Sequence, residues 1–177
     1  MKDPTLGWLL DPKDPSIRHQ ALIDLLHKAK DGKDVLAARE KIPSYWPVKK
    51  IIGTQTSKGF WSPKETCYRP KWTSAVWPLA LLGEMDAPPD SRISSECERF
   101  LDLHQTETGA FACPSKVEES KRWDEPCLTG NMIRTLIKFG YSNDPRVRRA
   151  FDWLPKDQLE DGGWNMEVGT ATILRRK

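Results

Sequence analysis

A seven-residue phrase, Gln-x-x-x-Gly-x-aromatic, constrains the fold of this chain more than any other feature, because it is written three times. The copies are Gln55-x-x-x-Gly59-x-Trp61, Gln105-x-x-x-Gly109-x-Phe111 and Gln158-x-x-x-Gly162-x-Trp164. Their glutamines are separated by 105 − 55 = 50 and 158 − 105 = 53 residues. A repeat of this length is typical of an array of similar structural units. We refer to it as the Gln-Gly-Trp phrase.

Two helix starts support the repeat independently. Asp14-Pro15 and Asp144-Pro145 each place a capping carboxylate before a proline at the first helical position, where the missing N–H costs nothing. Apolar residues then recur at helical spacing. After the first start these are Ile17, Ala21, Leu22, Leu25 and Leu26; after the second they are Val147, Ala150, Phe151 and Leu154, with Pro155 disturbing the last turn.

The remaining pattern also favours helices and predicts an all-α fold. Further helices are expected over 35–42, 45–55, 72–83, 91–104 and 128–139. Pro78 is expected to kink its helix or to tighten one turn, and Gly140 to end the last helix in a left-handed conformation. Period-two alternation is not sustained in any segment. Apolar helices (72–83, 128–139) alternate with amphipathic ones (91–104, 144–155), which predicts an inner and an outer layer.

Each Gln-Gly-Trp phrase fits the end of an outer helix and is interpreted as a structural element, with no catalytic role for its residues. Glycine permits the positive φ needed to leave the helix. Glutamine can bond backbone groups at a neighbouring helix end, and the aromatic ring can pack over the junction. Phe111 in the second copy keeps the aromatic face and loses only a donor.

The three phrases resemble the QW repeats of triterpene cyclases and the related helices of protein prenyltransferase β subunits, over about residues 18–164. The run Cys127-Leu128-Thr129-Gly130-Asn131-Met132 is similar to uncharacterised prokaryotic members of that group. The resemblance implies an α/α toroid. A closed toroid has about six helix pairs and this chain has about three. A half or truncated toroid is therefore expected over 1–164, with repeats ending near 61, 111 and 164 and a disordered basic tail over 165–177.

The family's catalytic motifs do not carry over. Neither Asp-x-Asp-Asp nor Asp-Asp-x-x-Asp occurs, so no acid for alkene protonation and no diphosphate–magnesium site is expected. Asp124 and Cys127 depart from the prenyltransferase Asp-x-Cys spacing, and no histidine follows His104. No metal, cofactor or catalytic residue is therefore predicted. The weaker hypothesis is a zinc site built from Cys113, Cys127 and His104, with Cys67 as a further thiolate; small core cysteines are the competing interpretation.

An apolar cavity is the other candidate site. The residues proposed to line it are Trp72, Trp77, Trp123, Cys127 and Met132. Such a wall could hold an isoprenoid chain, whereas ordinary core packing would explain each residue singly.

Charge and hydropathy exclude two classes of partner. The net charge of +3 comes from 28 basic and 25 acidic residues mixed along the chain, which disfavours nucleic acid. The longest apolar run, 76–82, is too short to span a bilayer. Without a secretory signal, the four cysteines are expected to be reduced thiols in the cytoplasm.

The leading functional hypothesis is a non-catalytic binding or interaction module that offers an apolar concave face. Self-association, or another protein partner, is expected at the unfinished edge near Trp164. The alternative is an isoprenoid-handling enzyme, of prenyltransferase or cyclase type, completed by another subunit or by further sequence.

Overall fold

The computed structural model describes residues 4–61, 66–114 and 123–164, and over these residues the chain is all-α, as predicted. The α-helices are α1 Pro4–Leu9, α2 Pro15–Gln20, α3 Lys33–Lys41, α4 Trp46–Ile52, α5 Val76–Glu84, α6 Ser91–His104, α7 Pro126–Lys138 and α8 Pro145–Asp157. Within these ranges β-pairing is limited to two isolated bridges, Thr66 with Pro114 and Gln105 with Phe111. None of the helices described is long and apolar enough to cross a membrane. The expected basic tail, 165–177, lies outside the described residues.

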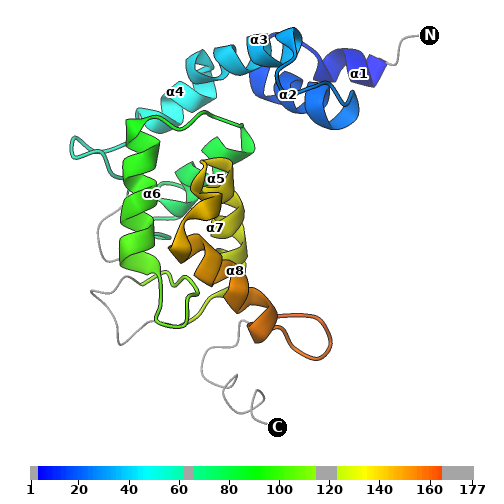
Figure 1. Cartoon of the computed structure of the whole chain (residues 1–177). Coiled ribbons are helices and arrows are strands. Elements are labelled where there is room, and N and C mark those ends of the chain that lie inside the picture. The colour runs from blue at the N-terminus through cyan, green and yellow to red at the C-terminus, as the bar shows by residue number, and fades with distance from the viewer. Residues whose placement is uncertain (1–3, 62–65, 115–122, 165–177) are drawn as a thin grey trace.

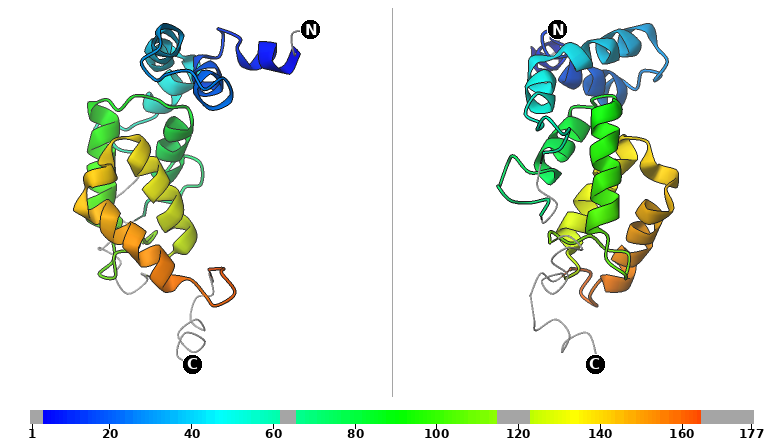
Figure 2. Two further views of the ribbon diagram at one scale, coloured as in Figure 1. Left: turned by 45° about the vertical axis from the view of Figure 1, so that its right-hand side comes forward. Right: turned by 90° about the vertical axis from the view of Figure 1, so that its left-hand side faces the viewer.

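The helices form two groups (Figures 1 and 2). Helices α1 to α3 lie together at the end of the molecule that carries the N-terminus, and α5 to α8 pack beside one another at the other end, with α4 leading from one group toward the other. The first group has a small core of Leu22, Val35 and Ala38. The main core runs from Ile42 and Val48 to Ala150, so α4 contributes to the second group.

The expected alternation of apolar and amphipathic helices holds only in part, because α5 is apolar on most sides whereas α6, α7 and α8 each have one buried and one exposed face. α5 contacts α7, and α7 contacts α8. The face of α6 predicted to be apolar is buried along its whole length. Its residues are Ile93, Cys97, Phe100, Leu101 and His104. Gly140 has a φ of 93° and follows α7, as predicted.

Aspartates cap three helices through the same contact. The side chain of Asp14 accepts the backbone N–H of Ile17 at 3.1 Å, as predicted for the start of α2. Asp144 likewise accepts the N–H of Arg146 at 2.8 Å at the start of α8. The side chain of Asp90 accepts the N–H groups of Arg92 and Ile93, both at 3.0 Å, at the start of α6. Each carboxylate satisfies an N–H that has no partner inside its helix.

The helix expected over 72–83 begins four residues later, at Val76. Trp72 precedes it with a φ of 73° and so is not helical. Pro78 consequently falls in the first turn, where an N–H would have no acceptor in any case. A proline in this position does not interrupt the hydrogen-bond ladder, so it causes no kink. The turn just before it is tightened, because the N–H of Trp77 donates to the carbonyl of Ser74, three residues earlier, at 3.0 Å.

Two further expectations are corrected by the side-chain positions. Phe151 was expected on the apolar face of α8 but is 60% exposed, and Trp153 is buried instead. The inward face of α8 is Val147, Ala150, Trp153 and Asp157. The helix expected to reach Gln55 ends at Ile52, so the first phrase begins beyond a short turn.

Candidate functional site

The three Gln-Gly-Trp phrases form the same backbone turn. In each, the glycine N–H donates to the carbonyl of the residue after the glutamine, and that residue's N–H donates to the carbonyl after the glycine. The first bonds are Gly59 to Thr56 (2.9 Å), Gly109 to Thr106 (3.2 Å) and Gly162 to Leu159 (2.9 Å). The second are Thr56 to Phe60 (2.8 Å), Thr106 to Ala110 (2.8 Å) and Leu159 to Gly163 (2.9 Å). The glycine φ values of 80°, 106° and 86° make this turn possible.

The tryptophans of the phrase bond the helix that precedes them. The indole Nε1–H of Trp61 donates to the carbonyl of Ile51 at 3.1 Å, and that of Trp164 donates to Leu154 at 2.9 Å. Both acceptors lie ten residues upstream, near the end of a helix, where carbonyls lack intrahelical partners. Phe111 has no donor; its fully buried ring packs edge-on against Phe100 at 5.0 Å.

The glutamines link consecutive outer helices in the first two copies. The side-chain amide of Gln55 donates to the carbonyl of Arg92 at 3.4 Å, and that of Gln105 donates to Arg146 at 2.7 Å. Arg92 and Arg146 are the second residues of α6 and α8. The amide of Gln158 donates to Gly162 at 2.6 Å, inside its own turn. Over the residues that the structure describes, it makes no bond to a further helix.

Replacing Gln105 should therefore cost more than replacing Gln158. Gln105 is 6% exposed and also donates to Gly109 at 2.9 Å, so Gln105→Met removes two hydrogen bonds of a buried amide. We expect a loss of about 2 kcal/mol in the free energy of unfolding. Gln158→Met, at an exposed position, should lose less than about 1 kcal/mol. Urea denaturation of both variants tests this, and equal losses would contradict the linking role of Gln105.

A buried group of a histidine, two thiols and a carboxylate lies where the second phrase meets the amino-terminal ends of α5 and α7. Its members are Cys67, His104, Cys113 and Glu125. Cys67 is fully buried, His104 is 1% exposed, Glu125 is 7% exposed and Cys113 is half-buried. The Sγ of Cys113 lies 3.3 Å from Oε2 of Glu125, and the Sγ of Cys67 lies 3.7 Å from the carbonyl of Cys113. We call these residues the thiol cluster.

The two thiols of the thiol cluster have opposite acidities. Burial by itself raises the pKa of Cys67, but hydrogen bonds with Cys113 and His104 and the charge on His104 outweigh it and lower this pKa below its ordinary value. The contact with Cys67, followed by burial, raises the pKa of Cys113. Cys67 is thus the thiol that loses its proton first.

The structure brings together some of the residues proposed as zinc ligands. His104, Cys113 and Cys67 meet in the thiol cluster, whereas Cys127 lies exposed in the first turn of α7. No group of three or more His, Cys, Asp or Glu side chains in the described ranges is arranged to hold a metal ion. Sequence reasoning missed Glu125, because nothing in its local pattern indicates that it reaches back to Cys113.

The residues proposed for an apolar cavity are spread over different environments. Met132 is buried in the core, while Trp72, Trp123 and Cys127 are exposed. Trp72 and the half-buried Trp77 pack against each other with ring centroids 4.4 Å apart. Tyr68 adds a third ring, 4.9 Å from Trp77, and the Lys71 ammonium lies 4.9 Å from the Trp72 ring. These four residues form an aromatic surface before α5.

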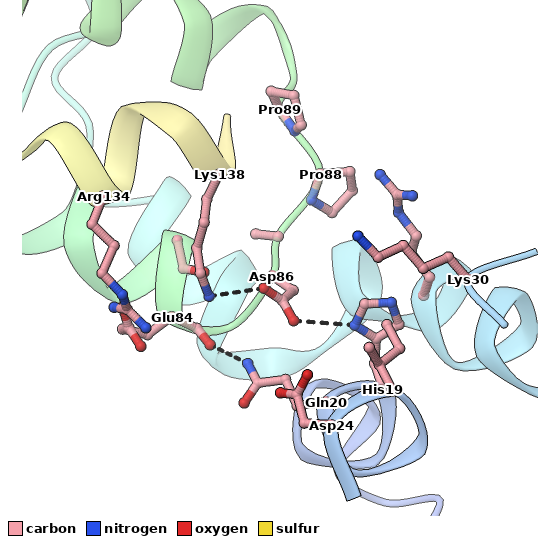
Figure 3. Close-up of a pocket in the computed structure, with 14 residues that line it drawn as sticks. His19, Gln20, Asp24, Lys30, Glu84, Asp86, Pro88, Pro89, Arg134 and Lys138 are labelled. Atoms are coloured by element: carbon pink, nitrogen blue, oxygen red, sulfur yellow. Dashed lines mark hydrogen bonds and ion pairs between the residues drawn. The ribbon is translucent and has the colours of Figure 1, made fainter. Parts of the chain in front are cut away.

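A polar pocket of about 430 Å³ separates α2 from the end of α5 and from α7. Figure 3 shows Asp86 at its centre, between His19 and Lys138. The two Asp86 oxygens lie 3.1 Å from Nδ1 of His19 and 3.0 Å from Nζ of Lys138. Gln20 donates to the backbone carbonyl of Glu84, so both contacts tie the amino-terminal helices to the α5–α6 connector. The charges at the pocket centre are thus engaged in joining the two helix groups.

Comparison of the chain with protein-family models, with curated proteins and with solved structures found no match.

Proposed function

We propose that this chain is a non-catalytic helical-repeat interaction module, a half or truncated α/α toroid, which binds a second copy of itself through the edge formed by α8 and the third phrase. The observation that carries the proposal is the third glutamine. Gln55 and Gln105 each reach the next outer helix, whereas Gln158 bonds only within its own turn over the described residues. The edge after α8 thus corresponds to a surface that is covered in both earlier units.

The exposed residues at this edge suit a protein partner. Phe151 is 60% exposed and Trp164 is 44% exposed. The residues that correspond to Trp164 in the first two phrases, Trp61 and Phe111, are buried. Large exposed aromatic residues near one another are a common feature of interaction surfaces.

The charges around Phe151 favour a second copy as the partner. Arg148, Asp152 and Lys156 are exposed on α8, so the surface carries both signs. In a two-fold contact the same surface occurs on both sides, and a surface of mixed sign can pair with itself. The proposal places the module in the cytoplasm, where free thiols such as its four cysteines persist.

Light scattering and sedimentation equilibrium over a range of concentrations test the self-association. We expect a dimer for the unmodified chain and a monomer for Phe151→Glu, which puts a charge in the contact without touching the core. Leu36→Glu is the matched control, because Leu36 is 42% exposed on α3 in the other helix group. It should remain dimeric. A chain that is monomeric at every concentration, or a dimer that Phe151→Glu leaves unchanged, would overturn the proposal.

One observation favours a second candidate, an isoprenoid-handling enzyme completed by another subunit. The aromatic surface (Tyr68, Lys71, Trp72, Trp77) sets an ammonium group over two indoles that pack against each other at a tilt, which suits an apolar chain with an anionic head. Titration with a prenyl diphosphate should quench tryptophan fluorescence, and Trp72→Ala should remove the response. The uncharged prenyl alcohol should bind more weakly. Equal binding of both, or none, would contradict this candidate.

A further inference from the structure

The thiol cluster places two cysteines opposite each other although 46 residues separate them in the sequence. Thr66 pairs antiparallel with Pro114, so the residues on either side, Cys67 and Cys113, face each other across the same pair. The backbone N–H of Cys67 donates to the carbonyl of Cys113 at 3.4 Å. Opposed residues in such a pair have Cα atoms about 4.5–5.5 Å apart, within the range of roughly 4.4–6.8 Å that disulfides span. The pairing of the two segments therefore suits a disulfide between these cysteines.

His104 is held in the orientation of a base. Its Nδ1 lies 3.1 Å from the carbonyl of Ala112, and because a carbonyl can only accept, Nδ1 carries the proton. In the neutral ring, Nε2 is then the bare nitrogen. It is buried without a conventional hydrogen bond from any residue the structure describes, and it belongs to the ring that interacts with the Cys67 thiol. Stacking on Phe100, with centroids 5.3 Å apart, fixes the ring plane.

Glu125 has the same relation to the second thiol. Its Oε1 accepts the backbone N–H of Cys113 at 2.6 Å, which anchors the carboxylate. Its Oε2 accepts the Cys113 thiol at 3.3 Å. The Cys113 thiol thus donates to a carboxylate, and the Cys67 thiol interacts with the His104 ring, whose Nε2 has no conventional hydrogen bond among the described residues.

We propose that Cys67 and Cys113 are a reversible dithiol–disulfide pair that reacts with a hydroperoxide, with His104 and Glu125 as the proton acceptors. The Cys67 proton passes to Nε2 of His104. The Cys67 thiolate then attacks one peroxide oxygen and the O–O bond breaks. The leaving oxygen takes the proton back from His104 and departs as water or alcohol, which leaves a sulfenic acid on Cys67.

The second step closes the disulfide. Cys113 attacks the sulfenic sulfur of Cys67 as its proton passes to Glu125, the S–S bond forms, and hydroxide leaves and takes that proton as water. In sum, two thiols are oxidised to a disulfide and one hydroperoxide is reduced. Hydrogen peroxide gives two molecules of water, and an alkyl hydroperoxide gives water and an alcohol. A small thiol in excess reverses the change by exchange.

The other two cysteines lack these features. Cys97 is fully buried on α6, and burial raises its pKa to about 12. Cys127 is exposed as a residue. Partial desolvation of its sulfur, followed by the nearby Glu125 charge, raises its pKa. Cys113 is half-buried and is the more accessible thiol of the pair. Oxidation should therefore select Cys67 and Cys113.

The unmodified full-length chain provides the first test. It is treated with hydrogen peroxide in the presence of a chelator, and the thiols are counted and mapped by mass spectrometry. We expect two of the four thiols to be lost, one peptide pair linked through Cys67 and Cys113, and full recovery with dithiothreitol.

Three variants separate the steps. In Cys113→Ser, the Cys67 sulfenic acid should accumulate and be trapped by a cyclic 1,3-diketone. His104→Asn keeps a donor for the Ala112 carbonyl and removes the base, so sulfenic acid formation should slow by about 10-fold or more. Glu125→Gln should leave sulfenic acid formation unchanged and slow its conversion to the disulfide. Cys127→Ser is the matched control and should oxidise at the original rate.

A disulfide mapped to Cys97 or Cys127, or a pair that resists peroxide while Cys127 is consumed, would overturn the proposal. Stoichiometric zinc in the protein as purified, lost in Cys67→Ser, would also overturn it, because the thiolates would then serve as metal ligands. The wild-type map requires no substitution, so a variant that fails to fold does not remove the test.

Discussion

Replacing Gly109 with alanine should destabilise the protein by about 4 kcal/mol, because two costs coincide at this glycine. Its φ of 106° disfavours any side chain, at about 1–2 kcal/mol. A Cβ would also lie 2.9 Å from the carbonyl oxygen of Arg149 in α8. That oxygen is backbone and cannot turn aside, and overpacking of this kind costs about 1–3 kcal/mol. The measurement is the free energy of unfolding in urea.

The other two phrases supply matched controls. Gly59 has a φ of 80° and no atom within 4 Å of an added Cβ, and at Gly162 the nearest atom is 4.0 Å away. Gly59→Ala and Gly162→Ala should therefore cost only the backbone strain, about 1–2 kcal/mol. Three equal losses would show that α8 does not press on the second turn as the structure has it.

Stability should fall as the pH rises from about 4.5 to about 7, by roughly 3 kcal/mol from Glu96 alone. Glu96 is fully buried on α6, and this burial outweighs its ion pair with Arg99 (2.9 Å) and raises its pKa from 4.5 to about 7. Between these pH values the folded state holds a proton that the unfolded state has lost. Folding is therefore favoured at the acid end of the window and the advantage disappears above it.

Glu96→Gln isolates this contribution, because an amide resembles the protonated acid. The variant should lack this fall and should be more stable than the unmodified chain at about pH 8. Glu98→Gln is the control: its carboxylate, 49% exposed, pairs with Arg146 at the surface. In that variant the free energy of unfolding should still fall as the pH rises. Urea denaturation across the pH range gives the comparison, and an unchanged slope for Glu96→Gln would contradict it.

The elements of the fold were predictable where neighbouring residues decide them. Asp144-Pro145 predicted the start of α8, Gly140 predicted the end of α7, and the spacing of Ile93, Cys97 and Phe100 predicted the buried face of α6. The prediction of the buried face failed for α8, where two faces of the helix carry large apolar residues. Phe151 and Trp153 lie two residues apart on α8, and only packing against the rest of the core determines which is buried.

The candidate site was less predictable than the fold. The zinc hypothesis grouped His104, Cys113 and Cys67 from their residue types, but it also included Cys127, which is exposed, and it missed Glu125. The aromatic residues of the phrase were assigned a packing role, which leaves out the indole bonds to Ile51 and Leu154. Every residue has a backbone carbonyl, so the sequence does not show which residue accepts such a hydrogen bond.

By itself the sequence determined the helical units, their order and the turn that ends each unit, because capping, helical periodicity and glycine φ are local properties of the chain. Only the tertiary structure decided that Trp61 and Phe111 of the first two copies are buried while Trp164 of the third is 44% exposed. It also decided which acid is buried, at Glu96, and which thiols meet, at Cys67 and Cys113. These depend on segments some tens of residues apart being packed together, and burial then changes the chemistry of side chains whose identity alone would leave them ordinary.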